Sequence, residues 1–233
     1  MAIKSSTFGR VELSGKDAAR FVQHMNEDKA NPLALAALAR GREISEKIKK
    51  GEAFKMKAMP DTDYYIRKLE ASDTVQNFKV GSQSFLPLKT FLQKQAKQFQ
   101  QSSIAQTYVA VTGDKTIIGF VTLTCSEIDL QHGYDLSDCS HANNYEFLPA
   151  VKIARLAVDN RYRSSGIGST LVDYAIALIR DKIAENVGCR FVVTDAKSEA
   201  VNFYEKQGFV LLDSEGNQST EHQLMFLDLV GLA

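Results

Sequence analysis

The sequence is poor in cysteine, proline and tryptophan, and it has no long apolar run. Its 233 residues include three cysteines, four prolines and no tryptophan. Three cysteines without a Cys-x-x-Cys pair argue against a disulfide framework and a zinc site. No run approaches the roughly 18 apolar residues that span a bilayer, and the N-terminus lacks the apolar core of a secretory signal. We therefore expect a cytoplasmic protein with no metal and no membrane contact.

The charges balance overall but are unevenly distributed. Lysine and arginine number 28, as do aspartate and glutamate. Residues 1–60 hold 12 basic and 7 acidic side chains, a net charge of +5, so the remainder carries −5. A nucleic-acid partner ordinarily requires an excess of basic side chains, which the total does not supply. The asymmetry indicates instead that the two parts attract each other.

The hydrophobic pattern predicts two parts of unequal size. Residues 1–57 are expected to hold a short extended piece and two helices, the first capped by Ser14 and the second begun by Asn31 and Pro32. Elements this short cannot bury a core alone, so we expect them to pack on the rest of the chain or on a second copy in a homodimer. Residues 62–233 form the larger predicted domain.

The larger part alternates between strand-like and helix-like segments. Strands are expected at 64–69, 108–111, 117–124, 150–158, 191–194, 209–212 and 222–229, and helices at 85–98, 168–183 and 199–207, with polar connections at 127–144 and 213–220. A hairpin followed by two β-α-β units predicts an α/β (α+β) fold. We expect a mixed, mostly antiparallel sheet flanked by helices, with a small helical appendage at the N-terminus.

A glycine-rich turn joins the strand at 150–158 to the helix that follows. It contains the pattern Arg163-x-x-Gly166-x-Gly168. Glycines allow the backbone to approach a ligand, and the N–H groups and dipole at a helix N-terminus favour an anion. The turn lacks the Gly-Lys-Ser/Thr of a Walker loop and the third glycine of a dinucleotide-binding fold. It therefore suits a pyrophosphate, although a purely structural turn is the alternative.

A second motif lies about thirty residues downstream. It reads Asn202-Phe-Tyr204-Glu-Lys-Gln-Gly208-Phe209, and the strand before the first motif reads Ala-Arg-Leu-Ala-Val-Asp. Together, in this order and spacing, the two motifs resemble the GNAT family of acetyl-CoA-dependent N-acetyltransferases. The resemblance covers residues 151–212 closely, and with the preceding hairpin it extends over about residues 62–230. It implies the GNAT fold and acetyl-CoA as the acetyl donor.

The resemblance also implies roles for particular residues. The backbone of the strand end would contact the pantetheine and thioester, the turn and first helical residues would receive the pyrophosphate, and an asparagine would bond to the cofactor arm. These are Leu156, Ala157 and Val158, then Arg163, Ser164, Ser165, Gly166, Ile167, Gly168, Ser169 and Thr170, then Asn202. The N–H of Val158 is the expected donor to the tetrahedral oxyanion.

The resemblance makes Tyr204 the acid that protonates the departing thiolate. A free thiol has a pKa of about 8.5 and a tyrosine of about 10, so a hydrogen-bonded tyrosine can supply this proton. The alternative is a core aromatic residue, because Phe203 and Phe209 flank it. The sequence identifies no general base for the acceptor amine.

Two further resemblances narrow the function. Asn77-Phe-Lys-Val-Gly81 with the following Leu-x-x-Phe-Leu is similar to a segment of the GNAT toxins of toxin–antitoxin modules, with Val80 where those carry cysteine. Such toxins acetylate aminoacyl-tRNA and stop translation. Residues 11–35 resemble the toxin-binding tail of the ribbon-helix-helix antitoxins encoded beside them. The combination implies a toxin with a neutralising antitoxin tail fused to it.

Two alternatives stay open. The acidic larger part suits a GNAT enzyme that acetylates a small-molecule or protein amine instead of tRNA. A catalytically idle fold that binds acetyl-CoA as a regulatory module is the other. A tRNA partner would require a local basic patch, for which Lys89, Lys94, Lys97, Lys152, Arg161 and Arg163 are the candidates. Residues 1–57 could also serve only to complete the fold.

Overall fold

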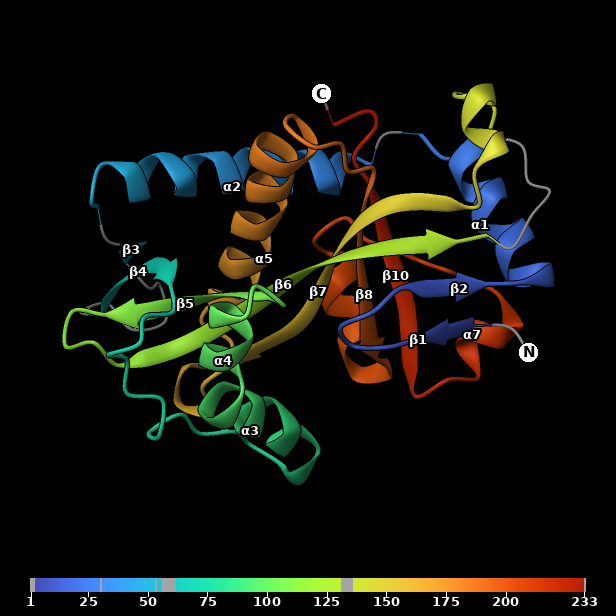
Figure 1. Cartoon of the computed structure of the whole chain (residues 1–233). Helices are drawn as coiled ribbons and strands as arrows, with labels where there is room; N and C mark the ends of the chain where they lie inside the picture. The colour runs from blue at the N-terminus through green and yellow to red at the C-terminus, as the bar shows by residue number, and fades with distance from the viewer. Residues whose placement is uncertain (1–2, 30, 53, 56–61, 131–135, 233) are drawn as a thin grey trace. The chain divides into compact units, whose positions relative to one another are not determined.

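The computed structural model describes residues 3–29, 31–52, 54–55, 62–130 and 136–232 (Figure 1). The chain divides into two compact units. The central unit comprises Ala39–Thr124 and Ile153–Leu178, and the terminal unit comprises Met1–Leu38, Cys125–Lys152 and Ile179–Ala233. Helix α2 (Pro32–Lys49) and strands β6 (Ile117–Asp129) and β7 (Phe147–Val158) carry the chain from one unit to the other. The boundary expected near residue 57 lies outside the described residues.

Antiparallel strands form the sheet of the central unit. Strand β3 (Phe54–Lys55) pairs with β4 (Asp63–Lys68), β4 with β5 (Gln106–Thr112), and β5 with β6. The register Tyr108↔Val121 confirms the hairpin that the sequence predicts, and Lys115 in its turn has a φ of 65°. Strand β5 is buried almost throughout, so helices must cover both of its faces.

The predicted helix over 85–98 is wrong as a single element. A 3-10 turn η1 (Gln83–Phe85) leads into α3 (Leu86–Lys94), and α4 (Ala96–Gln101) follows after a break at Gln95. The rings of Phe91 and Phe99 meet edge to face at 5.7 Å. In an unbroken helix, residues eight apart are separated by about 12 Å along the axis. The break therefore lets both rings enter one core.

Helix α5 (Ile167–Leu178) packs closely on its neighbours in the central unit. A side chain at Gly119 would come within 2.9 Å of Ile167, and one at Gly41 would collide with the backbone carbonyl of Asp173. Next to this contact, the Arg40 guanidinium forms two hydrogen bonds, of 2.6 and 2.9 Å, with the Asp173 carboxylate. The later part of α2 thus contacts α5 backbone to backbone.

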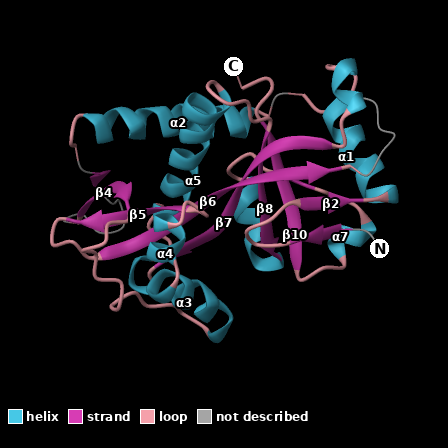
Figure 2. Cartoon of the chain, in the orientation of Figure 1, coloured by secondary structure: helices cyan, strands magenta, loops and turns pink. Residues whose placement is uncertain are grey.

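The terminal unit is built on a mixed sheet (Figure 2). Strand β7 pairs in parallel with β8 (Phe191–Lys197) from Ala150 to Lys152, β8 pairs antiparallel with β10 (His222–Asp228), and β10 with β9 (Val210–Leu211). Near the N-terminus, β1 (Ile3–Ser5) pairs with β2 (Val11–Leu13), which runs parallel to the end of β6. The mixed sheet and flanking helices confirm the predicted fold class.

The remaining elements are short. They are the turns η2 (Ser140–Asn144), η3 (Asn160–Tyr162) and η5 (Ser198–Ala200), the π-helix η4 (Ile179–Ala184), and helices α6 (Val201–Glu205) and α7 (Glu215–Gln218). Two polar stretches contain more structure than expected, since β6 continues to Asp129 and α7 lies within 213–220. Asn217 explains the second: its buried amide bonds to the backbone of Leu212 and Leu224.

Helix α1 (Gly15–Glu27) contributes directly to the core of the terminal unit. Ser14 stands at its N-cap position, as predicted, but its side chain forms no capping hydrogen bond with the helix. Phe21 is fully buried, with its ring 5.3 Å from that of Phe191 and 4.8 Å from that of Phe226. At its polar edge Arg20 binds the Asp213 carboxylate through two hydrogen bonds of 2.6 and 2.8 Å. The N-terminal segment is therefore an integral layer of this unit.

The start of α2 contacts the loop that follows α6. The Asn31 side chain accepts a hydrogen bond from the Leu33 N–H at 2.9 Å and donates one to the Gly208 carbonyl at 3.1 Å. This confirms Asn31 as the cap and Pro32 as the first helical residue. Gly208 has a φ of 90°, and a side chain there would collide with the backbone of Ala34. No helix of the described chain is long and apolar enough to cross a membrane.

Candidate functional site

The end of β7, the turn after it and the start of α5 form one continuous element of the central unit. Leu156, Ala157 and Val158 are consecutive half-exposed residues, without the buried–exposed alternation of an ordinary strand. All the residues predicted from Leu156 to Thr170 therefore lie on a single strand–turn–helix element.

A buried carboxylate holds the turn in shape. Asp159 is fully buried and accepts hydrogen bonds from the Lys79 N–H at 2.8 Å and the Arg161 N–H at 3.0 Å. The Arg161 guanidinium adds two more, of 2.9 and 2.8 Å. Burial alone would raise the pKa of Asp159, but the bonds from Arg161 and Lys79 hold that pKa below its usual value. The charge of the Arg161 guanidinium is therefore compensated by the Asp159 carboxylate.

The backbone of the turn is shaped to face an anion. Ser164 has a φ of 62° and Gly166 a φ of 87°, so the chain passes twice through the left-handed region. A turn with left-handed positions directly before a helix N-terminus brings backbone N–H groups close to a ligand, where an anion is favoured. The first bond of α5 runs from the Thr170 N–H to the Gly166 carbonyl, so the N–H groups of Ile167 and Gly168 precede the helical ladder.

Two of the predicted hydroxyl ligands are used within the element itself. The Ser165 hydroxyl donates to the Tyr162 carbonyl at 2.6 Å, and the Thr170 hydroxyl donates to the Gly166 carbonyl at 3.1 Å. The Tyr64 hydroxyl in turn donates to Thr170 at 3.2 Å. The backbone, and not these side chains, is what the turn offers to a ligand.

Arg163 is the cation that the turn leaves available. It is exposed, and it forms no ion pair with any residue that the structure describes. Its guanidinium carbon lies 5.2 Å from the centre of the Phe85 ring, within the range of a cation–π interaction. Arg161 and Arg163 are thus two residues apart but differ in their charge pairing: Asp159 compensates Arg161, whereas Arg163 has no such partner among the described residues.

The segment Asn77–Gly81 is bound to the same turn. The Asn160 N–H donates to the Lys79 carbonyl at 2.9 Å, and the Arg161 guanidinium donates to the Asn77 carbonyl at 3.1 Å. A side chain at Gly81 would collide with the Asn160 amide and approach Arg163 Nη1 to 3.3 Å. The upstream motif that the sequence singles out therefore forms one wall of the glycine-rich turn.

Tyr204 lies on α6 in the terminal unit and is 6% exposed. Its ring packs edge to face on Phe203 at 5.1 Å and on Phe209 at 5.4 Å. Burial raises the pKa of Tyr204 to about 12, against a smaller opposing effect from its hydrogen bond with the Thr194 side chain. The hydroxyl therefore stays protonated at any physiological pH. Asn202, on the same helix, is exposed.

The predicted site residues thus fall into two groups. Those from Leu156 to Thr170 belong to the central unit, and Asn202 and Tyr204 belong to the terminal unit. Three residues that shape these groups escaped the sequence analysis: Asp159, Phe85 and Thr194. Asp159 could have been noticed as a lone acid at the end of an apolar strand. Phe85 belongs to the toxin-like segment that begins at Asn77, but the sequence gives it no role there, and nothing in the sequence connects Thr194 to the motifs.

The basic patch expected for a nucleic acid is smaller than the sequence indicates. Lys152 is 1% exposed and paired with Asp195 at 2.6 Å in the terminal unit, so its place in the patch is wrong. Arg161 is neutralised by Asp159, and the Lys97 ammonium donates to the carbonyls of Ala71 and Asp73. The candidates of the central unit that keep an uncommitted charge are Lys89, Lys94 and Arg163.

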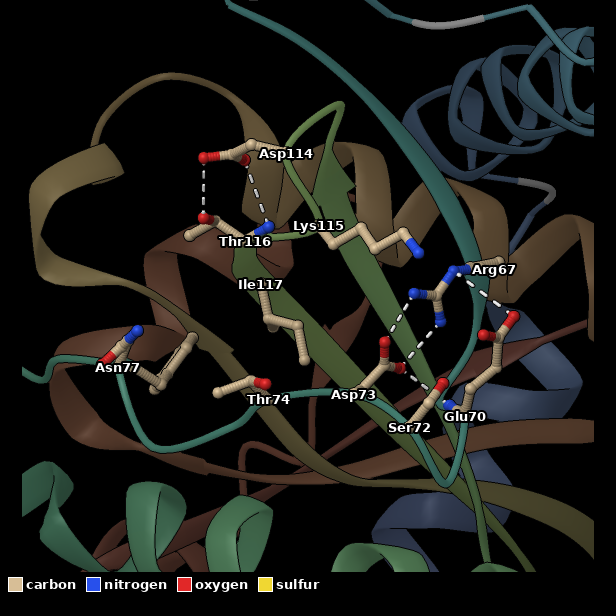
Figure 3. A pocket seen from close by; sticks show the side chains of 11 residues that line it. Arg67, Glu70, Ser72, Asp73, Thr74, Asn77, Asp114, Lys115, Thr116 and Ile117 are labelled. Atoms are coloured by element: carbon tan, nitrogen blue, oxygen red, sulfur yellow. Dashed lines mark hydrogen bonds and ion pairs between the residues drawn. The ribbon is translucent and has the colours of Figure 1, made fainter.

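A polar hollow of about 390 Å³ lies in the central unit between the β5–β6 turn and residues 70–78 (Figure 3). Its main cation is already committed: Arg67 binds the Asp73 carboxylate at 2.7 and 2.6 Å and lies 3.6 Å from Glu70. The hydrogen bond with Asp73 raises the pKa of Arg67. Burial alone would raise the pKa of Asp73, but the Arg67 guanidinium lowers it below its usual value. We regard this hollow as a structural feature.

The comparison with protein families agrees with this geometry. Residues 103–211 match the family model described as an acetyltransferase (GNAT) domain. The match includes β5–β6, the whole glycine-rich element and the helix that carries Tyr204.

Solved structures share the fold. A tyrosine-to-phenylalanine mutant of the toxin AtaT, bound to the C-terminus of the antitoxin AtaR and acetyl-CoA, is 21% identical with a TM-score of 0.58, over 72% of this chain and 95% of that chain. A tyrosine-to-phenylalanine mutant of KacT is 23% identical with a TM-score of 0.61, over 72% and 96%. AtaT complexed with acetyl-methionyl-tRNAfMet is 24% identical with a TM-score of 0.59, over 73% and 97%.

Proposed function

From the premise that this chain carries an acetyltransferase domain of the GNAT family, we propose that it transfers the acetyl group of acetyl-CoA to an amine. The observation that carries the proposal is the glycine-rich element: two left-handed backbone positions, a helix N-terminus and the uncompensated charge of Arg163. These features suit the two phosphates of a pyrophosphate. The GNAT structures solved with acetyl-CoA support the same donor.

The proposed reaction is a direct transfer. The amine nitrogen attacks the thioester carbonyl carbon, a tetrahedral intermediate forms, and the C–S bond breaks. The Val158 N–H would stabilise the oxyanion, and Tyr204 would give its proton to the leaving thiolate and recover one from water. The proton that the amine loses passes to solvent. Burial raises the pKa of Tyr204 to about 12, so its hydroxyl is protonated before the step, but the same shift makes it a weaker acid toward the thiolate.

For the acceptor we propose the amine of an aminoacyl-tRNA, which would make the protein a toxin that blocks translation. The toxin-like segment Asn77–Gly81, which walls the turn, and the likeness to AtaT solved with acetyl-methionyl-tRNA support this substrate. One observation favours a small-molecule or protein amine instead. Two of the six candidate cations are not available to phosphates, because Lys152 is buried and the Lys97 ammonium is bound to backbone carbonyls.

We propose that residues 1–57 act in cis as a fused antitoxin-like tail. In support, the segment contacts the surroundings of Tyr204: Asn31 and Ala34 lie against Gly208, four residues beyond the tyrosine. The structure of AtaT bound to the C-terminus of the antitoxin AtaR supports such an arrangement. The rival role, completing the fold, is favoured by the full burial of Phe21 in the core of the terminal unit.

Incubation with radiolabelled acetyl-CoA tests the acceptor. The full chain is offered charged tRNA, the same tRNA without its amino acid, small amines and proteins, with Tyr204→Phe as the inactive control. Label on charged tRNA alone supports the proposal. Label on proteins or small amines alone replaces it with the second candidate, and no label on any acceptor contradicts an enzymatic function.

Point substitutions test the tail better than deletion does, because deletion removes Phe21 and Leu13 from the core. Arg20→Ala removes the ion pair to Asp213, and Asn31→Ala removes the bond to Gly208. Lys16→Ala is the matched control, since Lys16 is an exposed cation of the same helix. A neutralising tail predicts faster turnover in the first two variants. Unchanged or slower turnover would assign residues 1–57 to the fold.

A further inference from the structure

We infer that Phe85 and Gly81 are positioning residues that hold Arg163 in place for the pyrophosphate of the donor. The inference rests on the proposed donor site and adds two residues outside the glycine-rich motif. Neither has a side chain that can bind a phosphate. Both contact or border the Arg163 guanidinium, so any effect they have on the donor must pass through that group.

Arg163 would otherwise be a poorly ordered cation. It is exposed, and none of the described residues pairs with it as Asp159 pairs with Arg161. A free arginine side chain carries about 2 kcal/mol of rotamer entropy, which is lost when the guanidinium is fixed on a ligand. Stacking on an aromatic ring fixes the plane of the guanidinium but leaves its N–H groups available. The Phe85 ring supplies this stacking at 5.2 Å.

Phe85 is itself in a defined place. It ends the turn η1 and is the residue from which α3 begins, and its backbone N–H donates to the Ser82 carbonyl at 3.2 Å. The Phe85 ring is half-buried, so it presents one face without moving into the core. The segment before it is bound to the glycine-rich turn through Lys79 and Asn77. Ring and turn are therefore parts of one rigid arrangement within the central unit.

Gly81 also borders the Arg163 guanidinium. Its ideal Cβ would stand 3.3 Å from Arg163 Nη1 and would collide with the end of the exposed Asn160 side chain. A methyl group at this position would therefore push the Asn160 amide aside and crowd the guanidinium, which should disturb its place over the Phe85 ring.

The chemistry predicts which ligands respond. A fixed guanidinium binds the oxygens of a phosphate or pyrophosphate through paired N–H groups. Acetyl-CoA carries a pyrophosphate, whereas S-acetylpantetheine has the same thioester and arm without it. Loss of the positioning should therefore weaken the binding of acetyl-CoA and leave the binding of S-acetylpantetheine unaffected. The turnover number with saturating acetyl-CoA should also stay unchanged, because Arg163 is proposed to bind the pyrophosphate and not the reacting carbonyl carbon.

The experiment is a double-mutant cycle on the full chain. The dissociation constants of acetyl-CoA and S-acetylpantetheine are measured by calorimetry for the wild type, Phe85→Leu, Arg163→Ala and the double variant. Leu86→Ala is the control, since Leu86 is the exposed apolar neighbour of Phe85 in the chain. Gly81→Ala is the second variant, and thermal unfolding of each protein confirms that it is folded. KM and kcat with acetyl-CoA are measured in parallel.

We expect Phe85→Leu to weaken acetyl-CoA binding about threefold to fivefold, the size of an exposed cation–π interaction. In the Arg163→Ala background the same change should have no further effect, since the cycle isolates the pair. Gly81→Ala should also weaken acetyl-CoA binding, and Leu86→Ala should leave the dissociation constant of acetyl-CoA unchanged.

Three results overturn the inference. Equal loss in both backgrounds, or equal loss for S-acetylpantetheine, would show that Phe85 acts through the general fold. Full affinity in Phe85→Leu, with clear weakening in Arg163→Ala, would remove the positioning role but keep the donor site. No binding of acetyl-CoA to the wild type would contradict the proposed function itself, and the two failures are thereby distinguished.

Discussion

The glycine-rich turn of the central unit and the α6 helix of the terminal unit carry the two family motifs, and they differ in almost every physical respect. The turn is exposed, its backbone takes left-handed conformations at Ser164 and Gly166, and none of the described residues pairs with the charge of Arg163. Around Tyr204 the chain is enclosed by aromatic rings, and the hydroxyl already shares a hydrogen bond with Thr194.

The difference suits the two roles proposed for them. A turn that binds an anion must leave polar groups unsatisfied until the ligand arrives, which is possible only where water can replace the ligand. A group that donates a proton must keep that proton and a fixed orientation, and burial provides both. Substitutions in the turn should therefore affect donor affinity, and substitutions around Tyr204 should affect turnover and stability.

The largest effect is expected at the tyrosine hydroxyl. Tyr204→Phe keeps the ring packing but removes the proton donor, so kcat should fall about 100-fold or more, as for other general acids. The dissociation constant of acetyl-CoA should stay within about twofold of the wild type. Turnover comparable with that of the wild type would place Tyr204 among the core aromatic residues.

Gly208 and Gly166, two of the glycines with a positive φ, allow the cost of packing to be separated from the cost of backbone strain. Gly208→Ala and Gly166→Ala both introduce a side chain at a φ near 90°, but only the first collides with another segment, at Ala34. Strain alone costs about 1 kcal/mol, and overpacking adds about 2 kcal/mol. Urea unfolding should therefore rank Gly208→Ala well below Gly166→Ala in stability. The opposite ranking would contradict the contact between α2 and Gly208.

Substitution of Asp159 should lower both donor affinity and stability. Asp159→Asn places an amide among N–H donors, so unfolding free energy should fall by about 2 kcal/mol and acetyl-CoA should bind more weakly. Because the pKa of Asp159 is lowered in the folded state, its contribution is full above the ordinary aspartate pKa and is lost as pH falls below it. Acid denaturation curves of the two proteins should accordingly converge. The exposed Glu205→Gln serves as the charge control.

The smallest effect is the alkaline dependence of stability. Burial raises the pKa of Tyr204 to about 12, above about 10 for an unfolded tyrosine. Its contribution is therefore full below pH 10 and is lost as pH rises through about 12. Between pH 9 and pH 11 the wild type should lose about 1 kcal/mol relative to Tyr204→Phe, measured by urea unfolding. A constant difference would show that the Tyr204 hydroxyl is not buried in solution.

Local patterns predict most of the elements. The hairpin of β5 and β6, the cap at Asn31 and the left-handed Gly208 follow from alternation, turn chemistry and capping, which depend on neighbours in the chain. The prediction of one helix over 85–98 is wrong because the break at Gln95 serves the contact between Phe91 and Phe99. The prediction of an irregular polar stretch around Asn217 is incomplete for a similar reason, since the buried Asn217 amide donates hydrogen bonds to the backbone carbonyls of Leu212 and Leu224.

The two motifs and the short-range geometry of the turn were enough to predict a GNAT-like domain and the glycine-rich turn, and the GNAT family model matches residues 103–211. The acid role of Tyr204 stays a prediction. Which charges are available became clear only from the fold. The motif singles out Arg163, but Arg161 and Lys152 also read as available cations. The fold places Asp159 against Arg161 and Asp195 against Lys152, whereas none of the described residues forms an ion pair with Arg163, whose guanidinium lies over the Phe85 ring. Asp195 is far from Lys152 in the chain. Asp159 is only two residues from Arg161, but its burial and its bond from the Lys79 N–H depend on the fold, so the local pattern does not reveal which arginine is compensated.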